Sequence, residues 1–440
     1  MSWIDKKVQS DRWGSGVVKA ERYGGHELLV KYDNDLIIWT PKSELTTNIV
    51  VKNVPINPPP DEHPKLIETE QINRLRVLEA LKFGVVPPNL KNFIFGRDEE
   101  VKRVKYWLQS RGGNLVVNGA YGAGKSHFLG YTRELALENG YAVAECAIDP
   151  TEAPLYKPKT IYRAIVKSFQ YGEEKNCFQN LIKAIIKRRK RLTENVYIDT
   201  LLNSSVDEPY FWRWIEGDDT IKTRHSYPTI PNETTASNII CSLLSAFSYY
   251  CQILLDLKGL LILFDEAESY DLVNSTQQFQ RGINFIKGLK MTADGAPLLL
   301  TENIGYYKGS VANEGEKSHL IYSGRNRVRY LFNRESNLKL VFAFTPTYEA
   351  RNLCEHLGFP SPLELKRLER KDRLDAFEAI YKLFSDSREG YSIDEKDLQY
   401  ITKACLDQIG PEVRTLVKGS IEALELREGS PETPIKELLS

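Results

Sequence analysis

Eight consecutive residues, GAYGAGKS from Gly119 to Ser126, fit the phosphate-loop pattern GxxxxGKS in full. Glycines allow the backbone to curve so that its N–H groups point at an anion. Lys125 would place a cation against the β- and γ-phosphates of a nucleotide, and Ser126 would offer its hydroxyl to Mg²⁺. An apolar run, LVVN at 115–118, predicts a strand before the loop, and SHFLGYTRELALE at 126–138 predicts a helix after it. The residues expected to surround the nucleotide are Gly119, Ala120, Tyr121, Gly122, Ala123, Gly124, Lys125, Ser126 and His127.

A second run, GLLILFDEAE at 259–268, places an acidic pair after a stretch of apolar residues. This pattern is typical of a buried parallel strand that ends at the carboxyl edge of a sheet. Asp265 would hold Mg²⁺ through water, and Glu266 would polarise the attacking water. The simpler alternative is a core strand whose acidic end is merely solvated. The complete phosphate loop upstream favours the catalytic interpretation.

Two further polar residues could reach the phosphates. LKLVFAFTPT at 338–347 predicts another buried strand, which ends in Thr345 at the same edge of the sheet. Thr345 could touch the γ-phosphate or orient the attacking water, or it could cap the next helix, and these roles are compatible. GPEVR at 410–414 opens a predicted helix from which Arg414 could lean onto the phosphates. The alternative for Arg414 is a solvated surface arginine.

The first 52 residues are predicted to form a separate module. Short β-rich runs at 13–18, 27–32 and 35–40 are separated by turn residues. Their length fits a small SH3- or Tudor-like β-barrel over residues 1–52. A hairpin packed on the main domain is the alternative.

The rest of the chain divides at a proline-rich stretch and at a change to helical periodicity. Residues 53–67 predict an extended, proline-rich linker. An α/β domain with a parallel sheet is predicted over 68–360, with a helical insertion at about 170–235 between two strands. Residues 361–440 predict a helical domain. The polar, glycine-containing stretch 293–318 predicts a long, mobile excursion.

The composition is that of an ordinary globular protein, with 42% hydrophobic and 27% charged residues. Lys plus Arg and Asp plus Glu both number 59, so no global charge attracts nucleic acid or a membrane. Six scattered cysteines without metal-like spacing predict reduced core residues of a cytoplasmic protein. The N-terminus does not resemble a signal peptide, and the longest apolar run, taken as Leu260–Phe264 with its flanks, falls far short of a membrane span.

The four chemical elements, in this order and with a helical bundle last, resemble the AAA+ ATPases. By this resemblance the Walker A, Walker B, sensor 1 and sensor 2 elements are, in order, Gly119–Ser126, Asp265-Glu266, Thr345 and Gly410–Arg414. FGRDEE at 95–100 resembles the entry signature of the origin-recognition and STAND-like branch of that class. The resemblance implies an ATP- and Mg²⁺-dependent α/β core with a C-terminal helical lid.

A narrower resemblance covers RVLEALKFGVVPPNLKNFIFGRDEEV at 76–101 and the loop that follows, which are similar to the ATP-binding proteins of BREX phage-resistance systems, the BrxD type. It implies a role in bacterial defence beside DNA and a protein partner, helicase-like or another defence component. A homo-oligomer is also expected, since AAA+ rings usually receive an arginine from the neighbouring subunit. Arg351, on the helix after Thr345, has a suitable position. The alternative group is Arg325, Arg327, Arg329 and Arg334.

Binding to DNA has two candidate features in the sequence. The dense cationic run could neutralise several phosphates, but it could equally be a solvated helix end that the helix dipole favours. Its residues are Lys187, Arg188, Arg189, Lys190 and Arg191. The aromatic cluster Tyr210, Phe211, Trp212 and Trp214 could stack on unpaired bases, although such clusters are more often the core of a small helical insertion. Residues 13–45 resemble Tudor/SH3-like modules, which would hold a protein partner or DNA.

Two hypotheses follow for the activity of the chain. The first is an ATPase that couples hydrolysis to assembly or remodelling on DNA. The second is a nucleotide-loaded switch or scaffold that does not hydrolyse ATP and recruits a partner through its N-terminal module. A small-molecule kinase is disfavoured by the acidic pair and the distant helical bundle, because a kinase would need its own pocket for the phosphate acceptor.

Overall fold

The computed structural model describes most of the chain in two compact units, Met1–Lys65 and Leu66–Ser440. The described residues are 6–10, 14–22, 27–33, 37–41, 45–46, 66–87, 93–172, 177–188, 195–208, 210–218, 227–231, 236–273, 275–306, 313–323, 328–388, 390–410 and 412–439. The predicted proline-rich linker lies outside these ranges, except that its last two residues begin a helix.

The first unit is an antiparallel sheet with the strand order β4-β3-β2-β1-β5. Its strands are β1 Lys7–Ser10, β2 Gly14–Arg22, β3 Glu27–Tyr32, β4 Ile37–Pro41 and β5 Leu45–Thr46. Alternate side chains on these strands point to one face and form a small core, which includes Val18, Val30 and Tyr32. A Cβ at Gly16 would lie 2.6 Å from Val30 Cγ1 and 2.8 Å from the carbonyl oxygen of Lys31, so β3 can approach β2 closely only because residue 16 is glycine.

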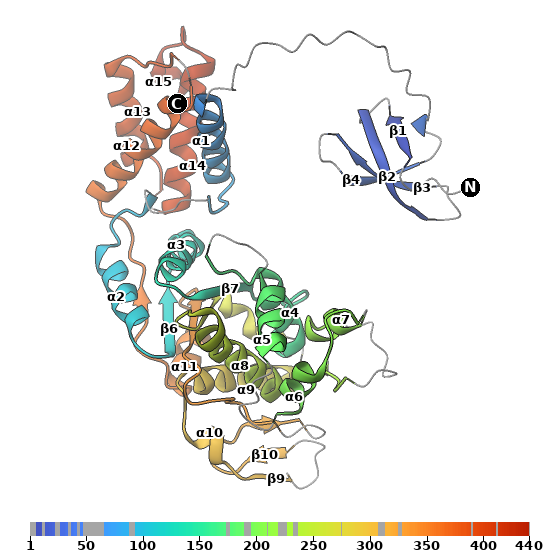
Figure 1. Cartoon of the computed structure of the whole chain (residues 1–440). Coiled ribbons are helices and arrows are strands. Elements are labelled where there is room, and N and C mark those ends of the chain that lie inside the picture. Colours follow the sequence, from blue (N-terminus) through green and yellow to red (C-terminus); the bar gives the residue numbers. More distant parts are fainter. Residues whose placement is uncertain are drawn as a thin grey trace. The chain divides into compact units, whose positions relative to one another are not determined.

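The second unit is built on a parallel five-stranded sheet with the order β13-β6-β12-β8-β7 (Figure 1). Its strands are β6 Gly113–Asn118, β7 Ala142–Ala147, β8 Leu260–Asp265, β12 Leu338–Phe344 and β13 Leu363–Glu364. All neighbouring strands run parallel, which confirms the predicted α/β class. Since β12 lies between β6 and β8, the residues that follow these three strands meet at one edge of the sheet.

Helices cover both faces of this sheet, as the alternating burial of its strands requires. Leu115 and Val117 of β6 pack in one core with α2 (Asp98–Gln109) and α3 (Lys125–Glu138). Val116, on the opposite face, belongs to a larger core with residues from α4 (Pro158–Ser168), α8 (Ser237–Leu255) and α9 (Thr276–Ala293). The sheet is therefore the middle of three layers.

The segment between β7 and β8 is helical, as predicted, and packs on the sheet. Its helices before α8 are α4 Pro158–Ser168, α5 Phe178–Arg188, α6 Val196–Asn203 and α7 Phe211–Ile215. Phe211 is fully buried and Trp214 is 4% exposed, and both belong to the large core. Their burial agrees with the core interpretation of the aromatic cluster and removes these two rings from any base-stacking surface.

Helix α8 corrects the prediction about apolar runs. SNIICSLLSAFSYYCQILL is longer than the stretch at Leu260–Phe264, and by length and mean hydropathy it could cross a membrane, although serines, Asn238 and Gln252 interrupt its apolar residues. In this fold 72% of that window is buried against the sheet and the neighbouring helices α5 and α9. The periodicity was hidden because a helix that is buried on nearly all sides shows no polar stripe.

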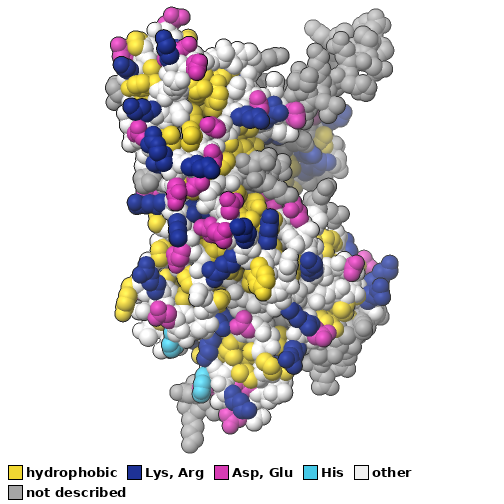
Figure 2. Space-filling view, turned by 90° about the vertical axis from the view of Figure 1, so that its left-hand side faces the viewer, with side chains coloured by type: hydrophobic (Ala, Val, Ile, Leu, Met, Phe, Trp, Pro, Cys, Tyr) yellow, Lys and Arg dark blue, Asp and Glu magenta, His cyan; other side chains and the backbone are white. Residues whose placement is uncertain are grey.

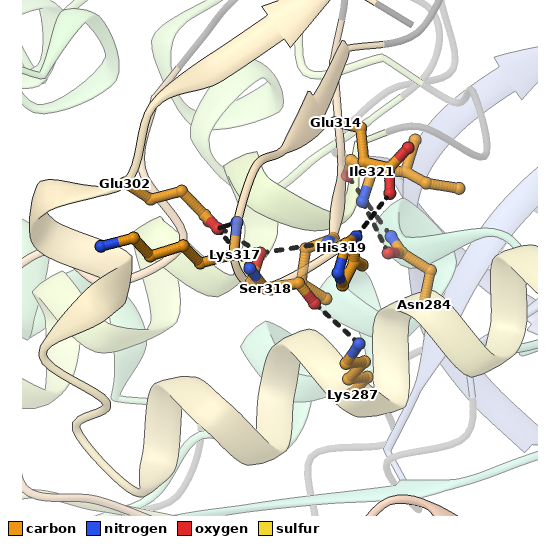
Figure 3. Close-up of polar contacts among 9 residues, drawn as sticks. Asn284, Lys287, Glu302, Glu314, Lys317, Ser318, His319 and Ile321 are labelled. Carbon is orange, nitrogen blue, oxygen red and sulfur yellow. Dashed lines mark hydrogen bonds and ion pairs between the residues drawn. The ribbon is translucent and has the colours of Figure 1, made fainter.

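The predicted excursion at 293–318 contains regular structure instead of a continuous loop. It holds α10 (Leu298–Thr301) and an antiparallel sheet formed by β9 Ile304–Tyr306, β10 Asn313–Gly315 and β11 Ile321–Tyr322. Glu302, 4% exposed, accepts hydrogen bonds from the backbone N–H groups of Lys317 and Ser318 and from the Ser318 hydroxyl (Figure 3). Lys287 of α9 donates to the Ser318 carbonyl at 2.7 Å, which joins this small sheet to the main core. The small sheet was not predicted because a buried carboxylate stabilises its turn, and its short strands have no strong sequence pattern.

The C-terminal helices pack together with a helix from far upstream. They are α12 Arg370–Asp386, α13 Glu395–Asp407, α14 Val413–Gly429 and α15 Ile435–Leu438. α1 (Leu66–Lys82) packs against α12 and α14, and its Leu78 and Leu81 share one core with Phe377 and Leu416 (Figure 1). The structure thus differs from the predicted division at 68 and 361, because α1 belongs with the C-terminal helices and not with the sheet.

A candidate nucleotide site at the carboxyl edge of the sheet

The phosphate loop follows β6 directly and ends where α3 begins. Gly122 and Gly124 have φ values of 77° and 90°, a left-handed conformation that glycine adopts without steric cost. Gly124 is the residue before Lys125, the first residue of α3, so the helix presents its free N–H groups and positive dipole end to the loop. The exposed Ser126 lies in the first turn of the same helix. This local geometry is the one the motif predicts.

Lys125 is held in place from two sides. Its Nζ donates to the carbonyl oxygen of Gly119 at 2.9 Å and to Oγ1 of Thr345 at 2.9 Å. The side chain is 9% exposed, so its charge lies in a largely desolvated part of the cleft. The strand order brings these two residues together although they lie 220 positions apart in the chain.

Asp265 and Glu266 end β8 two strands away from the loop strand. The backbone N–H of Glu266 donates to Oδ1 of Asp265 at 2.9 Å, and Glu266 itself has a φ of 52°. A left-handed non-glycine residue is uncommon and indicates a tightly constrained turn. Burial raises the pKa of Glu266, and the negative charges of Asp265, Glu268 and Asp149 raise it further, while Lys125 lowers it. A carboxylate with a raised pKa is suited to act as a general base near neutral pH.

Thr345 follows β12 and lies between the loop and the acidic pair. Its hydroxyl accepts from Lys125 and donates to Oε1 of Glu268, which lies in the short helix η4 (Ala267–Asp271). The alternative role of Thr345 as a helix cap is wrong, because Thr347 caps α11 (Tyr348–His356) by accepting from the N–H of Ala350.

Glu268 is a site residue that the sequence interpretation did not assign. It stands two positions after Glu266 in the run DEAE, and the acidic pair drew attention away from it. Only its place in the 3₁₀ turn, which directs the carboxylate to Thr345, makes it part of the site. A second acid at that spacing is the one signal in the sequence that could have pointed to it.

Arg414 is exposed at the start of a C-terminal helix and contacts the phosphate loop at Tyr121. It lies in the first turn of α14, and its guanidinium donates to the Tyr121 hydroxyl at 2.9 Å and lies 5.3 Å from the centre of that ring. Its backbone N–H donates to the carbonyl of Gly122 at 3.3 Å. These contacts join the start of α14 to the phosphate loop, and they give Tyr121 a role that its position in the motif did not predict.

An apolar cleft extends from the phosphate loop between α1, the segment that follows it, and the C-terminal helices. Its apolar walls include Val86, Phe93, Phe95, Ile380, Val413 and Val417. His127 of α3 also lines the cleft, and its Nε2 lies 2.9 Å from the carbonyl oxygen of Phe93. Burial lowers the pKa of His127, which favours the neutral ring. A flat, weakly polar group would fit beside these side chains, with its polar substituent on the loop.

Arg97, from the FGRDEE run, is hydrogen-bonded to the backbone of the phosphate loop. It is 5% exposed, donates to the carbonyl oxygen of Ala123 at 3.2 Å and pairs with Glu100 at 3.5 Å. A Cβ at the preceding residue, Gly96, would lie 2.4 Å from Oδ2 of Asp372 at the start of α12. The entry run therefore connects three parts of the unit: α2, the phosphate loop and the C-terminal helices.

The remaining predicted residues lie away from this site. Lys187 and Arg188 are exposed at the end of α5, whereas 189–191 lie outside the described residues. Arg351 is exposed on α11. Arg329 donates to the carbonyl of Glu302 at 3.2 Å, Arg334 is exposed, and Arg325 and Arg327 lie outside the described residues.

The residues present fit Mg²⁺ bound together with phosphates. Within the described ranges no three His, Cys, Asp or Glu side chains form a metal cage. Mg²⁺ usually keeps several waters and takes one or two protein ligands plus phosphate oxygens, so a cage is not required. The Ser126 hydroxyl and the Asp265 carboxylate, which line the same cleft, would be those ligands.

A parallel sheet covered on both faces, a GxxxxGKS loop at its carboxyl edge and an Asp-Glu pair on the strand two positions away define a P-loop protein of the AAA+ type. Residues 70–208 match the family described as BREX system ATP-binding protein BrxC/D. The chain therefore resembles that family over the segment from α1 to α6, which includes the phosphate loop, and the predicted resemblance is confirmed.

Among solved structures, AMPPCP-bound DnaA from Aquifex aeolicus is similar at 13% sequence identity, covering 80% of this chain and 70% of that chain with a TM-score of 0.34. No curated protein sequence matches the chain.

Proposed function

We propose that this chain binds Mg-ATP and hydrolyses it to ADP and phosphate, as a member of a BREX-like phage-defence system in the bacterial cytoplasm. One observation carries the proposal. The phosphate loop, the Asp265-Glu266 pair and Thr345 meet at one sheet edge, and Lys125 is already hydrogen-bonded to Thr345. The matching family consists of ATP-binding proteins, which supports ATP as the nucleotide.

Each residue of the site has a role in this reaction that follows from its chemistry. The loop amides and Lys125 bind the β- and γ-phosphates, and Ser126 and Asp265 hold Mg²⁺. Glu266 is the general base for the attacking water. Arg414 contacts the phosphates from α14, so the C-terminal helices act as a lid that closes on the nucleotide. The adenine base lies in the apolar cleft beside Phe93 and Phe95.

Steady-state phosphate release by the purified chain with Mg-ATP tests the proposal. Lys125→Ala is expected to abolish nucleotide binding and turnover together. Glu266→Gln is expected to lower turnover by about 10²–10⁴-fold while ATP binding is retained, because only the proton acceptor is removed. The exposed Glu349 on α11 supplies a matched control, and Glu349→Gln should leave both quantities unchanged. Loss of ATP binding in Glu266→Gln would contradict the role assigned to this carboxylate.

DNA is the proposed nucleic-acid partner, contacted by several weak sites in a homo-oligomer. The chain has no net charge, and on the face in Figure 2 acidic and basic side chains are interspersed, so summed weak contacts are favoured over one strong monomer site. Lys187→Glu combined with Arg188→Glu is expected to reduce DNA-stimulated turnover and its salt dependence. Lys418→Glu, at an exposed position on α14, is the control. Equal loss in both variants would count against a DNA contact at the end of α5.

A switch without hydrolysis is the second candidate, and the separate first unit favours it. Residues Met1–Lys65 form a compact unit with its own core, as an SH3- or Tudor-like adaptor for a helicase-like or other defence protein would. This function predicts nucleotide retained through purification and negligible phosphate release. Turnover that Lys125→Ala abolishes would exclude it.

A further inference from the structure

Glu268 and Thr345 form a hydrogen-bonded pair in which the direction of each bond can be deduced. Thr345 Oγ1 lies 2.9 Å from Lys125 Nζ and also bonds Oε1 of Glu268. A lysine ammonium only donates, and an ionised carboxylate only accepts. The single proton of the Thr345 hydroxyl therefore points to Glu268, and one of its lone pairs faces Lys125.

This direction limits what else Thr345 can bind. A hydroxyl has one proton and two lone pairs, so the remaining capacity of Thr345 is one acceptor site. The oxygens of a γ-phosphate are acceptors and cannot bond to that site, whereas a water molecule can donate to it. Of the two roles open to Thr345, contact with the γ-phosphate is thereby excluded and orientation of the water remains.

We propose that Glu268 is a positioning residue that holds the Thr345 hydroxyl as a hydrogen-bond acceptor for the attacking water. The inference rests on the proposed ATPase function and adds Glu268 to the residues that carry it. Glu268 lines the cleft together with Thr345 and Glu266. Its second oxygen, Oε2, is buried and has no hydrogen-bond partner among the described residues, so it too is available to a donor that enters the cleft.

Two ligands distinguish this role from a general effect on binding. A non-hydrolysable ATP analogue with Mg²⁺ reports contacts to the phosphates. ADP with aluminium fluoride and Mg²⁺ imitates the transferring phosphoryl group with its in-line water. Glu268→Ala is expected to weaken the fluoride complex by about tenfold, as loss of one hydrogen bond implies, and to leave the analogue nearly unaffected. Thr345→Val should give the same pattern.

The variants at the two positions also test whether Glu268 acts through Thr345. The double variant Glu268→Ala/Thr345→Val should be no weaker than Thr345→Val alone, since residues that act as one unit are not additive. Glu268→Gln keeps an acceptor for the Thr345 proton and should restore most of the affinity for the fluoride complex. Thr345→Ser keeps the hydroxyl and should do the same. Thermal melting of each variant confirms that it is folded.

Each outcome bears on a different claim. Equal weakening of both ligands by Glu268→Ala, additive losses in the double variant, or no effect at all would overturn the positioning role. A wild-type chain that binds both ligands but releases no phosphate would overturn the ATPase function, while the ligand comparison would still decide the role of Glu268. A wild-type chain that binds neither ligand would overturn both.

Discussion

At the scale of single residues, three carboxylates line the cleft together with Lys125 and Arg414. The three carboxylates lie within four positions at the end of β8 and are Asp265, Glu266 and Glu268. The positive charge of Lys125 lowers the pKa of Glu266, whereas the other two carboxylates raise it. Burial and these like charges both disfavour the ionisation of Glu266, so its pKa lies above that of an ordinary glutamate. In the proposed function, Mg²⁺ and phosphates would bind beside a carboxylate whose proton affinity the fold has already raised.

The raised pKa of Glu266 predicts an acid limb in the pH profile of turnover. Glu266 accepts a proton only when ionised, so turnover should fall as pH decreases through its raised pKa, at higher pH than for an unperturbed glutamate. Asp149→Asn removes one of the charges that raise this pKa and keeps the side-chain oxygen that Thr151 uses, so the limb should move to lower pH. Measured profiles of kcat against pH test the shift.

The neighbouring acid Glu152 provides the control for that experiment. Glu152 is not among the charges that raise the pKa of Glu266, so Glu152→Gln should leave the acid limb in place. If Asp149→Asn and Glu152→Gln moved the acid limb equally, surface charge in general, and not Asp149 in particular, would determine its pH.

At the scale of elements, buried polar side chains fasten strands and turns to their neighbours. Lys339 of β12 is fully buried, and its Nζ donates to the carbonyl oxygens of Trp107 and Gly112 and to the Ser110 hydroxyl. The ammonium also lies 4.4 Å from the centre of the Trp107 ring. A single side chain thereby joins β12 to the end of α2 and to the turn before β6.

Lys339→Met is expected to lower the free energy of unfolding by about 2–4 kcal/mol, because it removes three hydrogen bonds from a fully buried position. Burial lowers the pKa of Lys339 to about 7, well below that of an unfolded lysine. Between the folded and the unfolded pKa the unfolded chain binds the extra proton, so this group makes the wild type more stable as pH rises above about 7. The difference between wild type and variant should widen by at most about 1.4 kcal/mol per pH unit in urea unfolding from pH 7 to 9. A constant difference would show that Lys339 does not lose its proton in this range.

Glu302 has the corresponding role in the small sheet β9-β10-β11. Glu302→Ala removes the acceptor for two backbone N–H groups and for the hydroxyls of Ser318 and Tyr322. Hydrogen exchange over 313–323 should become faster, with a local loss of about 2–4 kcal/mol, while nucleotide affinity is unchanged. Glu316→Ala removes one exposed bond, to Asn303, and should have little effect. Unchanged exchange in Glu302→Ala would contradict the proposed role of this carboxylate.

At the scale of the whole molecule, each of the two units has a hydrophobic core of its own. The first unit buries residues of its antiparallel sheet, and the second buries the two faces of the parallel sheet and the core of the C-terminal helices. No core cluster of described residues includes members of both units. Units with separate cores generally unfold separately.

Removal of residues 1–65 is therefore expected to leave the second unit intact. Calorimetry of the full chain should resolve two transitions, and a chain that starts at Leu66 should keep the larger one within about 2 °C. Its affinity for a non-hydrolysable ATP analogue should stay within about twofold of the full chain. Loss of nucleotide binding on truncation would show that the first unit completes the site.

The sequence by itself determined those features whose physics is local. The glycines and Lys125 of the phosphate loop, the apolar strand that ends in Asp265-Glu266, and the helix opened by Arg414 were each predictable. A loop conformation, a strand pattern or a helix start depends on residues that are neighbours in the chain. The resemblance to BREX ATP-binding proteins rested on the same contiguous segment, and the family match covers it.

Only the tertiary structure decided which distant residues meet. Thr345 and Glu268 are 77 positions apart and pair because β12 lies beside β8, and α1 joins α12 and α14 rather than the sheet. Helix α8 was missed because burial on nearly all sides removes the polar stripe by which a helix is recognised. Strand order, register and helix packing depend on the summed contacts of the whole core, so no local pattern in the chain encodes them separately.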